Sequence, residues 1–207
     1  MRYKYPRTPH LPWSPGSNSD DKILKDTSHF EGKRVVVTEK FDGENTSLYC
    51  DYLHARSIDS AHHPSRDWVK GYHACFSHFI PEGWRICGEN LYATHSIEYS
   101  SLESYFLAFS IWDNEICLDY DQFEEWCGLL SLSTPQTLYL GLWDEDIIKN
   151  LEKDLDTTRV EGYVVRLFDS FFYQDFHKSV AKWVRTGHVQ TDKHWMFSKI
   201  VTNKVKE

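Results

Sequence analysis

The amino-acid sequence predicts an α+β fold with a mainly antiparallel, strongly twisted core. Short hydrophobic runs typical of strands recur between residues 34 and 185, and only short segments with helical spacing separate them. Aromatic residues make up 15% of the chain, which supplies the large apolar side chains of a sheet-rich core. A chain of 207 residues is long enough for one large domain.

The first 30 residues differ in composition from the rest of the chain. Prolines at positions 6, 9, 12 and 15 stand among Ser, Asp and aromatic residues. Proline fixes its φ angle and lacks a backbone N–H, so this segment can form neither a long helix nor a central strand. We therefore expect residues 1–30 to be an arm that packs on a single domain of residues 31–207.

A strand and a tight turn open the domain. Three valines at 35–37 lead into Lys40, the Asp-Gly-Glu sequence at 42–44 is typical of a turn, and Thr46–Tyr52 is extended again. Hydrophobic periodicity then predicts the later elements. They are a helix over Asp67–Phe79, strands over Trp84–Tyr92 and Tyr105–Trp112, helices over Asp121–Leu130 and Asp144–Leu151, and strands over Val160–Phe168 and Ser179–Arg185.

Composition and charge narrow the classes of function. No apolar run is long enough to span a bilayer and no signal segment opens the chain, so we expect a cytoplasmic protein without a membrane partner. Five scattered cysteines show no disulfide framework, and no histidine shows a zinc spacing. A net charge of −8 argues against non-specific coating of nucleic acid, so any nucleic acid must meet a local basic patch.

The segment 38–45 carries the strongest local signal for chemistry. It places Lys40 after a hydrophobic strand, among the carboxylates of Glu39, Asp42 and Glu44. Glu, Lys, Asp and Gly are also common turn residues, so a lysine on a surface hairpin fits this segment equally well when it is taken alone. The rest of the chain decides between the two interpretations.

Residues 39–45, Glu-Lys-Phe-Asp-Gly-Glu-Asn, resemble the nucleotidyl-lysine motif (Lys-x-Asp-Gly) of the polynucleotide ligase and mRNA-capping superfamily. Glu39 before the lysine and Asn45 after it resemble the RNA ligase branch of that superfamily. Further elements follow in the order that the family shows. They are Ala55–Ser57, Gly88–Tyr92, Ser104–Phe109, Val160–Arg166 and Val180–Arg185.

The last of these elements departs from the family pattern. The family places two basic residues at alternate positions of a strand, whereas here the second base comes one residue late. Side chains alternate between the faces of a regular strand, so Lys182 and Arg185 would point in opposite directions unless a bulge intervened. By the same parity, Arg166 could reach a phosphate only if its strand face lines the cleft.

The resemblance implies a nucleotidyltransferase domain that joins RNA with 3′-hydroxyl and 5′-phosphate ends and uses ATP with Mg²⁺ or Mn²⁺. Lys40 would attack the α-phosphate of ATP and carry the adenylyl group, and Asp42, Glu161 and Lys182 would be the other catalytic residues. Asp42 and Glu161 would hold the metal through water. The residues implied for nucleotide binding are Glu39, Lys40, Asn45, Arg56, Glu89, Phe109, Glu161, Lys182 and Arg185.

Three of these residues have specific roles by resemblance: Glu89 on a ribose hydroxyl, Phe109 stacked on the adenine, and Arg56 on the nucleotide and the RNA end. Lys40 must lose its proton before it can attack, and a free lysine has a pKa near ~10.4. We expect burial, the neighbouring cations Arg56 and Lys182 and a bound metal to lower the pKa of Lys40.

The resemblance covers roughly residues 35–186 and leaves no room for the separate carboxy-terminal domain that many ligases use. We expect the chain to act as a monomer and to replace that domain with its own arm, with a tail that contains His188, His194 and Trp195, or with an accessory protein. The arm carries Lys4 and Arg7 among aromatic residues and could either contact RNA or be a structural strap.

Several alternatives remain open from the sequence. A GTP-using capping enzyme and a DNA-nick ligase share the lysine chemistry. A non-catalytic module that binds an RNA end or a nucleotide could keep the fold without the activity. A purely structural interaction protein would give no reason for a lysine and three acids to stand in this order.

Overall fold

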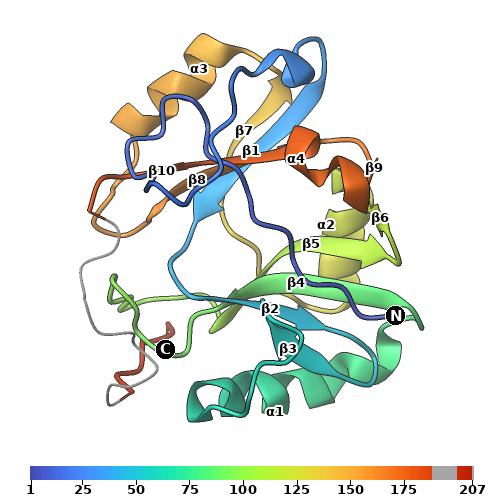
Figure 1. The fold of residues 1–207 in the computed structure, drawn as a ribbon. Helices are drawn as coiled ribbons and strands as arrows, with labels where there is room; N and C mark the ends of the chain where they lie inside the picture. Colours follow the sequence, from blue (N-terminus) through green and yellow to red (C-terminus); the bar gives the residue numbers. More distant parts are fainter. Residues whose placement is uncertain (188–199, 207) are drawn as a thin grey trace.

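The computed structural model describes residues 1–187 and 200–206, and their strands form two antiparallel sheets that lie one above the other (Figure 1). The upper sheet in Figure 1 has four strands. In spatial order they are β10 (Val180–Val184), β8 (Gly162–Leu167), β1 (Arg34–Lys40) and β7 (Thr137–Leu142).

The second sheet has six strands and lies below the first in the same view. Its central pair is the longest and forms the floor of the space between the sheets. In spatial order the six strands are β3 (Leu53–Ala55), β2 (Glu44–Leu48), β4 (Trp84–Asn90), β5 (Phe106–Asp113), β6 (Ile116–Cys117) and β9 (Phe171–Phe172).

Helices flank the sheets, with α3 above the four-stranded sheet and α1 below the six-stranded sheet in Figure 1. The α-helices are α1 (Asp67–Phe76), α2 (Tyr120–Leu129), α3 (Glu145–Asn150) and α4 (Phe176–Ser179). Short 3₁₀ turns lie at Ser28–Phe30, Pro64–Arg66, Ser77–Phe79, Leu151–Lys153 and Tyr173–Asp175. No helix among the described residues is both long and apolar enough to cross a membrane.

Strand β1 is hydrophobic on both faces because it lies inside the four-stranded sheet and is covered from both sides. Val35 and Val37 pack with Tyr163 and other buried residues of one core cluster, whereas Val36 joins a second cluster around Phe106. Alternate side chains of a strand point to opposite faces, which explains this division. The same alternation places Lys40 on the face of Val36, toward the six-stranded sheet.

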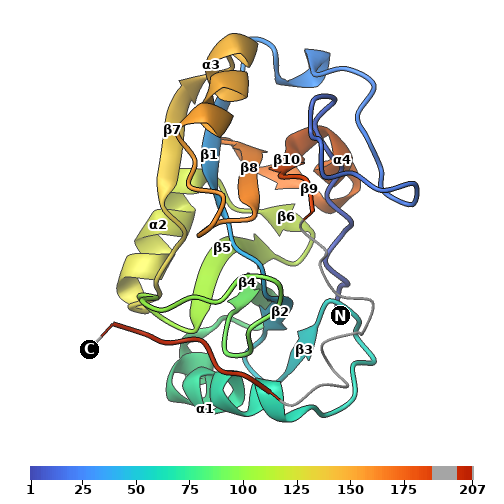
Figure 2. The ribbon, with the colours of Figure 1, turned by 90° about the vertical axis from the view of Figure 1, so that its left-hand side faces the viewer.

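The amino-terminal arm pairs with the outer edge of β10. Lys182 donates its backbone N–H to Pro9 O at 2.9 Å, and Leu11 donates to Lys182 O at 2.8 Å. Gly16 continues the contact with a bond to Val184 O at 2.8 Å. From there toward Met1 the chain crosses the side of the molecule between the two sheets, as Figures 1 and 2 show. The arm therefore protects a sheet edge and also closes one side of the space between the sheets.

The expected fold class is confirmed, with several differences in detail, among them the strand β3 and the helix α4, which no sequence pattern predicted. The extended segment expected over Thr46–Tyr52 ends at Leu48, because a turn closes with a bond from Tyr49 N to Tyr52 O at 2.8 Å. The sequence analysis missed β7, an edge strand that is largely exposed and so lacks a clean apolar face. It also missed the two-residue strands β6 and β9, which are shorter than any periodic signal.

Candidate active site

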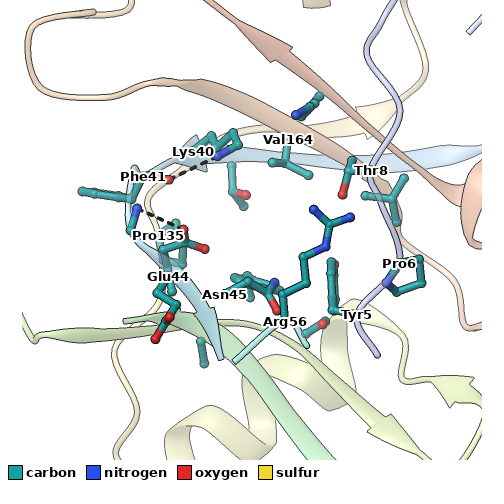
Figure 3. A pocket seen from close by; sticks show the side chains of 18 of the residues that line it. Tyr5, Pro6, Thr8, Lys40, Phe41, Glu44, Asn45, Arg56, Pro135 and Val164 are labelled. Carbon is teal, nitrogen blue, oxygen red and sulfur yellow. Dashed lines mark hydrogen bonds between the residues drawn. The ribbon is translucent and has the colours of Figure 1, made fainter. Parts of the chain in front are cut away.

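A cavity of about 790 Å³ lies between the two sheets. The four-stranded sheet lines it with Lys40, Val164 and Lys182, which belong to three neighbouring strands. The facing sheet contributes Asn45 from β2 and Glu89 from β4. In Figure 3 Lys40, Val164, Asn45 and Arg56 surround one open space. Residues up to 142 positions apart thus meet because the sheets face each other.

Lys40 lies at the last position of β1, where it pairs with Gly162 of β8. Its Nζ donates hydrogen bonds to Oε2 of Glu161 and, at 3.3 Å, to Phe41 O. A Cβ atom at position 162 would lie 2.0 Å from Trp183 O, so only glycine lets β10 approach β8 at this point. The sequence Glu161-Gly162 therefore places a carboxylate beside the lysine while the strands stay paired.

Carboxylates dominate the electrostatics around Lys40. Burial lowers its pKa, but Glu161 and Glu89 raise it by more, so the pKa of Lys40 lies above its ordinary value. The expectation that burial and nearby cations would leave a lowered pKa is therefore wrong for the protein without ligands. Burial also raises the pKa of Glu89 to about 7, and the Lys40 ammonium opposes this rise. Lys40 is therefore protonated in this arrangement, and the acids around it can also attract a metal cation.

Lys182 is the second cation at the site. Burial and the charge of Lys40 lower its pKa, with Asp21 and Glu161 acting in the opposite direction. It lies in β10, whose register with β8 is regular from Val180 to Val184. No bulge interrupts this pairing. Side chains of β10 therefore alternate between its two faces, and this alternation directs Lys182 into the cavity.

Arg185 lies outside this arrangement. It follows the end of β10, does not line the cavity, and donates from Nη1 to Thr186 O at 3.3 Å. Arg166 does line the cavity, together with Val164 on the same face of β8. However, it is buried and donates from Nη2 to Leu118 O at 2.6 Å, which ties it to the protein core.

Asp42, like Glu161, does not line the cavity itself, although its charge helps to raise the pKa of Lys40. Its Oδ2 accepts hydrogen bonds from the backbone N–H of Ser96, at 2.8 Å, and from the Ser96 hydroxyl. Its own N–H donates to the hydroxyl of Tyr99 at 2.9 Å. Asn203 holds this loop from the other side, because it is buried and its Oδ1 accepts from Tyr99 N at 2.9 Å. The structure thus places Asp42 in a loop clamp and not on the cavity wall.

Four more of the implied residues line the cavity: Glu39, Asn45, Arg56 and Phe109. Burial raises the pKa of Glu39, and Arg159 opposes this. Asn45 Oδ1 and Arg56 Nε are buried without a hydrogen-bond partner. Buried polar atoms are normally satisfied, so these two atoms indicate that a ligand completes the site.

Phe109 owes its position to a β-bulge in β5. Cys87 pairs with Ser110 and Gly88 pairs with Ala108, which leaves Phe109 as the extra residue between two ladder pairs. Bulges re-aim side chains, and here Phe109 faces the cavity. Its ring meets Tyr5 of the arm edge-on, with centroids 5.3 Å apart.

Sequence reasoning did not anticipate several residues of the site. Tyr5, Arg7 and Thr8 of the arm line the cavity. The basic and aromatic residues of the arm were a sequence signal for RNA binding. Only the pairing of the arm with β10 shows that these residues line the cavity. Ser96 and Tyr99 carried no motif, and their bonds to Asp42 became evident only from the structure.

Comparison with known proteins identifies the family of the chain. The sequence profile of the RNA ligase family matches residues 33–184, which is most of the chain and includes Lys40, Glu161 and Lys182. The chain belongs to the RNA ligase family. No curated protein sequence matches it.

Solved structures similar to this RNA ligase family member include an archaeal ATP-dependent RNA ligase, with a TM-score of 0.60 at 15% identity over 87% of this chain and 48% of that one. A lysine mutant of the Naegleria gruberi RNA ligase with ATP and Mn has a TM-score of 0.53 at 17% identity, over 77% of this chain and 52% of that one. A putative ATP-dependent DNA ligase from Aquifex aeolicus has a TM-score of 0.52 at 17% identity, over 77% of this chain and 46% of that one. This RNA ligase family chain spans about half the length of each.

The donors in this member of the RNA ligase family fit a hydrated divalent cation. Glu161 and Glu89 crowd negative charge around one ammonium, as the raised pKa of Lys40 shows. No three acidic, His or Cys side chains of residues 1–187 and 200–206 are arranged to hold an ion by themselves. Mg²⁺ commonly keeps several waters and binds through one or two carboxylates plus substrate phosphates, which suits Glu161 and Glu89. The Ser96 hydrogen bonds engage Oδ2 of Asp42 and not its Oδ1, and the charge of Asp42 already acts on Lys40 and Glu89.

Proposed function

We propose that this protein is an ATP-dependent RNA ligase that joins RNA 3′-hydroxyl and 5′-phosphate ends through a covalent adenylate on Lys40. The observation that carries this proposal is Lys40 itself: a lysine at the end of a strand, hydrogen-bonded to Glu161, in a cavity that also holds Lys182. The similar archaeal RNA ligase and the putative DNA ligase from Aquifex aeolicus are described as ATP-dependent, which supports ATP as the nucleotide.

In the first step the Lys40 proton passes to the Glu161 carboxylate, which already accepts a hydrogen bond from Nζ. The amine then attacks the α-phosphorus of ATP and forms a P–N bond. The bond from that phosphorus to the bridging oxygen breaks, and pyrophosphate leaves. Lys182 faces the same cavity and balances negative charge on the phosphates, as adenylyl transfer depends mainly on positioning and electrostatic stabilisation.

The next two steps transfer and then release AMP. An oxygen of the RNA 5′-phosphate attacks the adenylate phosphorus, the P–N bond breaks, and Lys40 recovers a proton. The RNA 3′-hydroxyl then attacks the activated 5′-phosphate, forms the phosphodiester and expels AMP. Arg56 reaches into the cavity (Figure 3) and is suited to hold the phosphate of the RNA end.

The adenosine would enter the aromatic part of the cavity. Phe109 is directed there by its bulge, and the buried Asn45 Oδ1 offers an acceptor without a partner. Glu89 lines the same cavity and could accept a hydrogen bond from a ribose hydroxyl. Mg²⁺ or Mn²⁺, held by Glu161 and Glu89 through water, would supply neutralisation of the phosphate charge.

The proposal is tested by incubating the protein with Mg²⁺ and, in separate reactions, α-labelled ATP or GTP. Label should remain on the denatured chain with ATP and should leave it when 5′-phosphorylated RNA is added, with joined RNA as the product. Label from GTP alone would indicate a capping-type enzyme instead. Absence of label with either nucleotide, from folded protein free of prebound adenylate, would favour a non-catalytic nucleotide or RNA-end binding module.

A further inference from the structure

A second, more open pocket of about 510 Å³ adjoins the cavity on the side of the arm. It shares Tyr5, Pro6, Arg7, Arg56 and Ser57 with the cavity, so the two spaces meet at these residues. We call this second pocket the arm groove. Lys4, Lys22 and Tyr173 complete its lining.

The arm groove concentrates positive charge on a protein with a net charge of −8. Lys4, Arg7, Lys22 and Arg56 line it, and no acidic side chain does. Among the described residues, none of these four cations forms an ion pair with a carboxylate. Asp21, which lines the adjoining cavity, is an acid whose charge acts on Arg7 and Arg56. Clustered cations that outnumber the nearby acids attract phosphate groups and release counterions when they bind them.

Arg56 links the groove to the chemistry. Its guanidinium points into the open space opposite Thr8 of the arm, and its buried Nε lacks a hydrogen-bond partner. Burial and the charge of Arg7 lower the pKa of Arg56, which shows that the two cations act on each other. Two cations held close together at the junction form a site for an anion that bridges the groove and the cavity.

Hydrogen bonds hold the backbone that carries the groove cations. Tyr173 donates its hydroxyl to Lys4 O at 2.6 Å, and His10 donates its N–H to Lys22 O at 2.7 Å. The side chain of Arg7 is held as well, because it donates from Nη1 to Asp20 O at 2.7 Å. A fixed backbone keeps the cations on one side of the arm, which lowers the conformational entropy lost when a polyanion binds.

We propose that the arm groove binds the sugar–phosphate backbone of a single-stranded RNA end and leads that end to Lys40. This inference rests on the proposed function and extends it, because it assigns the RNA path and its binding residues to the amino-terminal arm. Lys4 and Lys22 contact internal phosphates, while Arg7 and Arg56 lie where the terminal phosphate enters the cavity. The pyrophosphate part of ATP is the competing occupant, and the experiment separates the two.

The test compares the double variant K4E/K22E with K25E/K178E. Lys25 and Lys178 are exposed and line neither space, so the control variant makes the same change in net charge elsewhere. Fluorescence anisotropy measures binding of a 5′-phosphorylated single-stranded RNA over a range of salt concentrations. Adduct formation from labelled ATP without RNA is measured in parallel, and circular dichroism confirms that each variant is folded.

K4E/K22E should weaken RNA binding by about tenfold or more and make the log–log salt dependence shallower by about 1.4, since each single-strand phosphate contact contributes about 0.7. Any loss of adduct formation should be far smaller than the loss of RNA binding, and the control should resemble the wild type in both assays. Equal losses in the two assays, or RNA binding equal to that of the control, would overturn the inference. A wild type that binds RNA through this groove but forms no adduct would instead contradict the proposed function alone.

Discussion

Ser96 donates both its backbone N–H and its hydroxyl to Oδ2 of Asp42. Asp42 lies two residues after Lys40, so this contact fixes the turn that follows β1. Tyr99 adds a second contact, because its hydroxyl accepts from Asp42 N at 2.9 Å. The loop that contains Ser96 and Tyr99 thus acts as a clamp on the motif.

Replacing Ser96 with alanine should loosen this clamp. S96A keeps the backbone bond but removes the hydroxyl bond, so the free energy of unfolding should fall by about 1 kcal/mol. Adduct formation should slow as well, because the turn beside Lys40 is less firmly held. Chemical denaturation and labelled-ATP assays measure the two effects. S100A, at a neighbouring exposed serine, is the matched control, and S96A behaviour identical to S100A would refute a role for the clamp.

The buried ion pair of Arg66 and Glu44 should be costly to break from one side. Arg66 donates from Nε to Glu44 at 2.6 Å and from Nη2 at 2.5 Å, and the two side chains are only 6% and 11% exposed. R66M leaves a buried carboxylate without its partner and should lower the free energy of unfolding by about 3–5 kcal/mol. The double variant E44L/R66M should lose less than R66M alone, as measured by urea denaturation. A double variant that loses the sum of both single changes would rule out this coupling.

Stability should decrease in mild acid because of buried histidines. Burial lowers the pKa of His73 below its ordinary value of 6.5, although its hydrogen bond to Tyr49 O opposes the shift. The unfolded chain then binds the proton more tightly, so the stabilisation is complete above about pH 6.5 and is lost as the pH falls through the lower folded-state pKa. Denaturation at about pH 7.5 and about pH 5.5 should show a larger acid loss for the wild type than for H73Q. Equal acid losses would exclude His73 as a source.

The fold could be predicted from the sequence more completely than the orientation of the side chains at the site. The strands that carry Lys40, Glu89 and Lys182 appear near their expected positions, because each contains buried residues with a clear strand pattern. Motif order also placed these residues in one site, although no local rule could bring positions 40 and 182 together. That proximity depends on β1, β8 and β10 sharing a sheet.

The orientations that sequence reasoning missed depend on long-range contacts. Oδ2 of Asp42 is bonded to Ser96, which a loop more than 50 positions later supplies. Arg185 lies beyond the end of β10, so strand parity does not apply to it. The possible tail role of His188, His194 and Trp195 concerns residues outside the part of the chain that the structure describes.

Phe109 should contribute more to nucleotide binding than to folding. The ring is partly buried, occupies a bulge and faces the cavity, and it packs against the edge of the core cluster that contains Tyr5. F109A should weaken ATP binding by about 1–3 kcal/mol, the usual contribution of base–aromatic stacking, while the folded state persists. Isothermal titration with ATP and thermal unfolding measure the two effects. Unchanged ATP affinity in a destabilised variant would identify Phe109 as a core residue only.

The central claim is that Lys40 carries the adenylyl group. The most direct measurement is peptide mapping of wild-type protein after incubation with ATP and Mg²⁺, beside K40A treated in the same way, with circular dichroism to confirm that K40A is folded. An adenylate of alkali-stable, P–N type should appear on the peptide that contains Lys40 and on no peptide of K40A. An adenylate on K40A, or on another lysine of the wild type, would contradict the assignment.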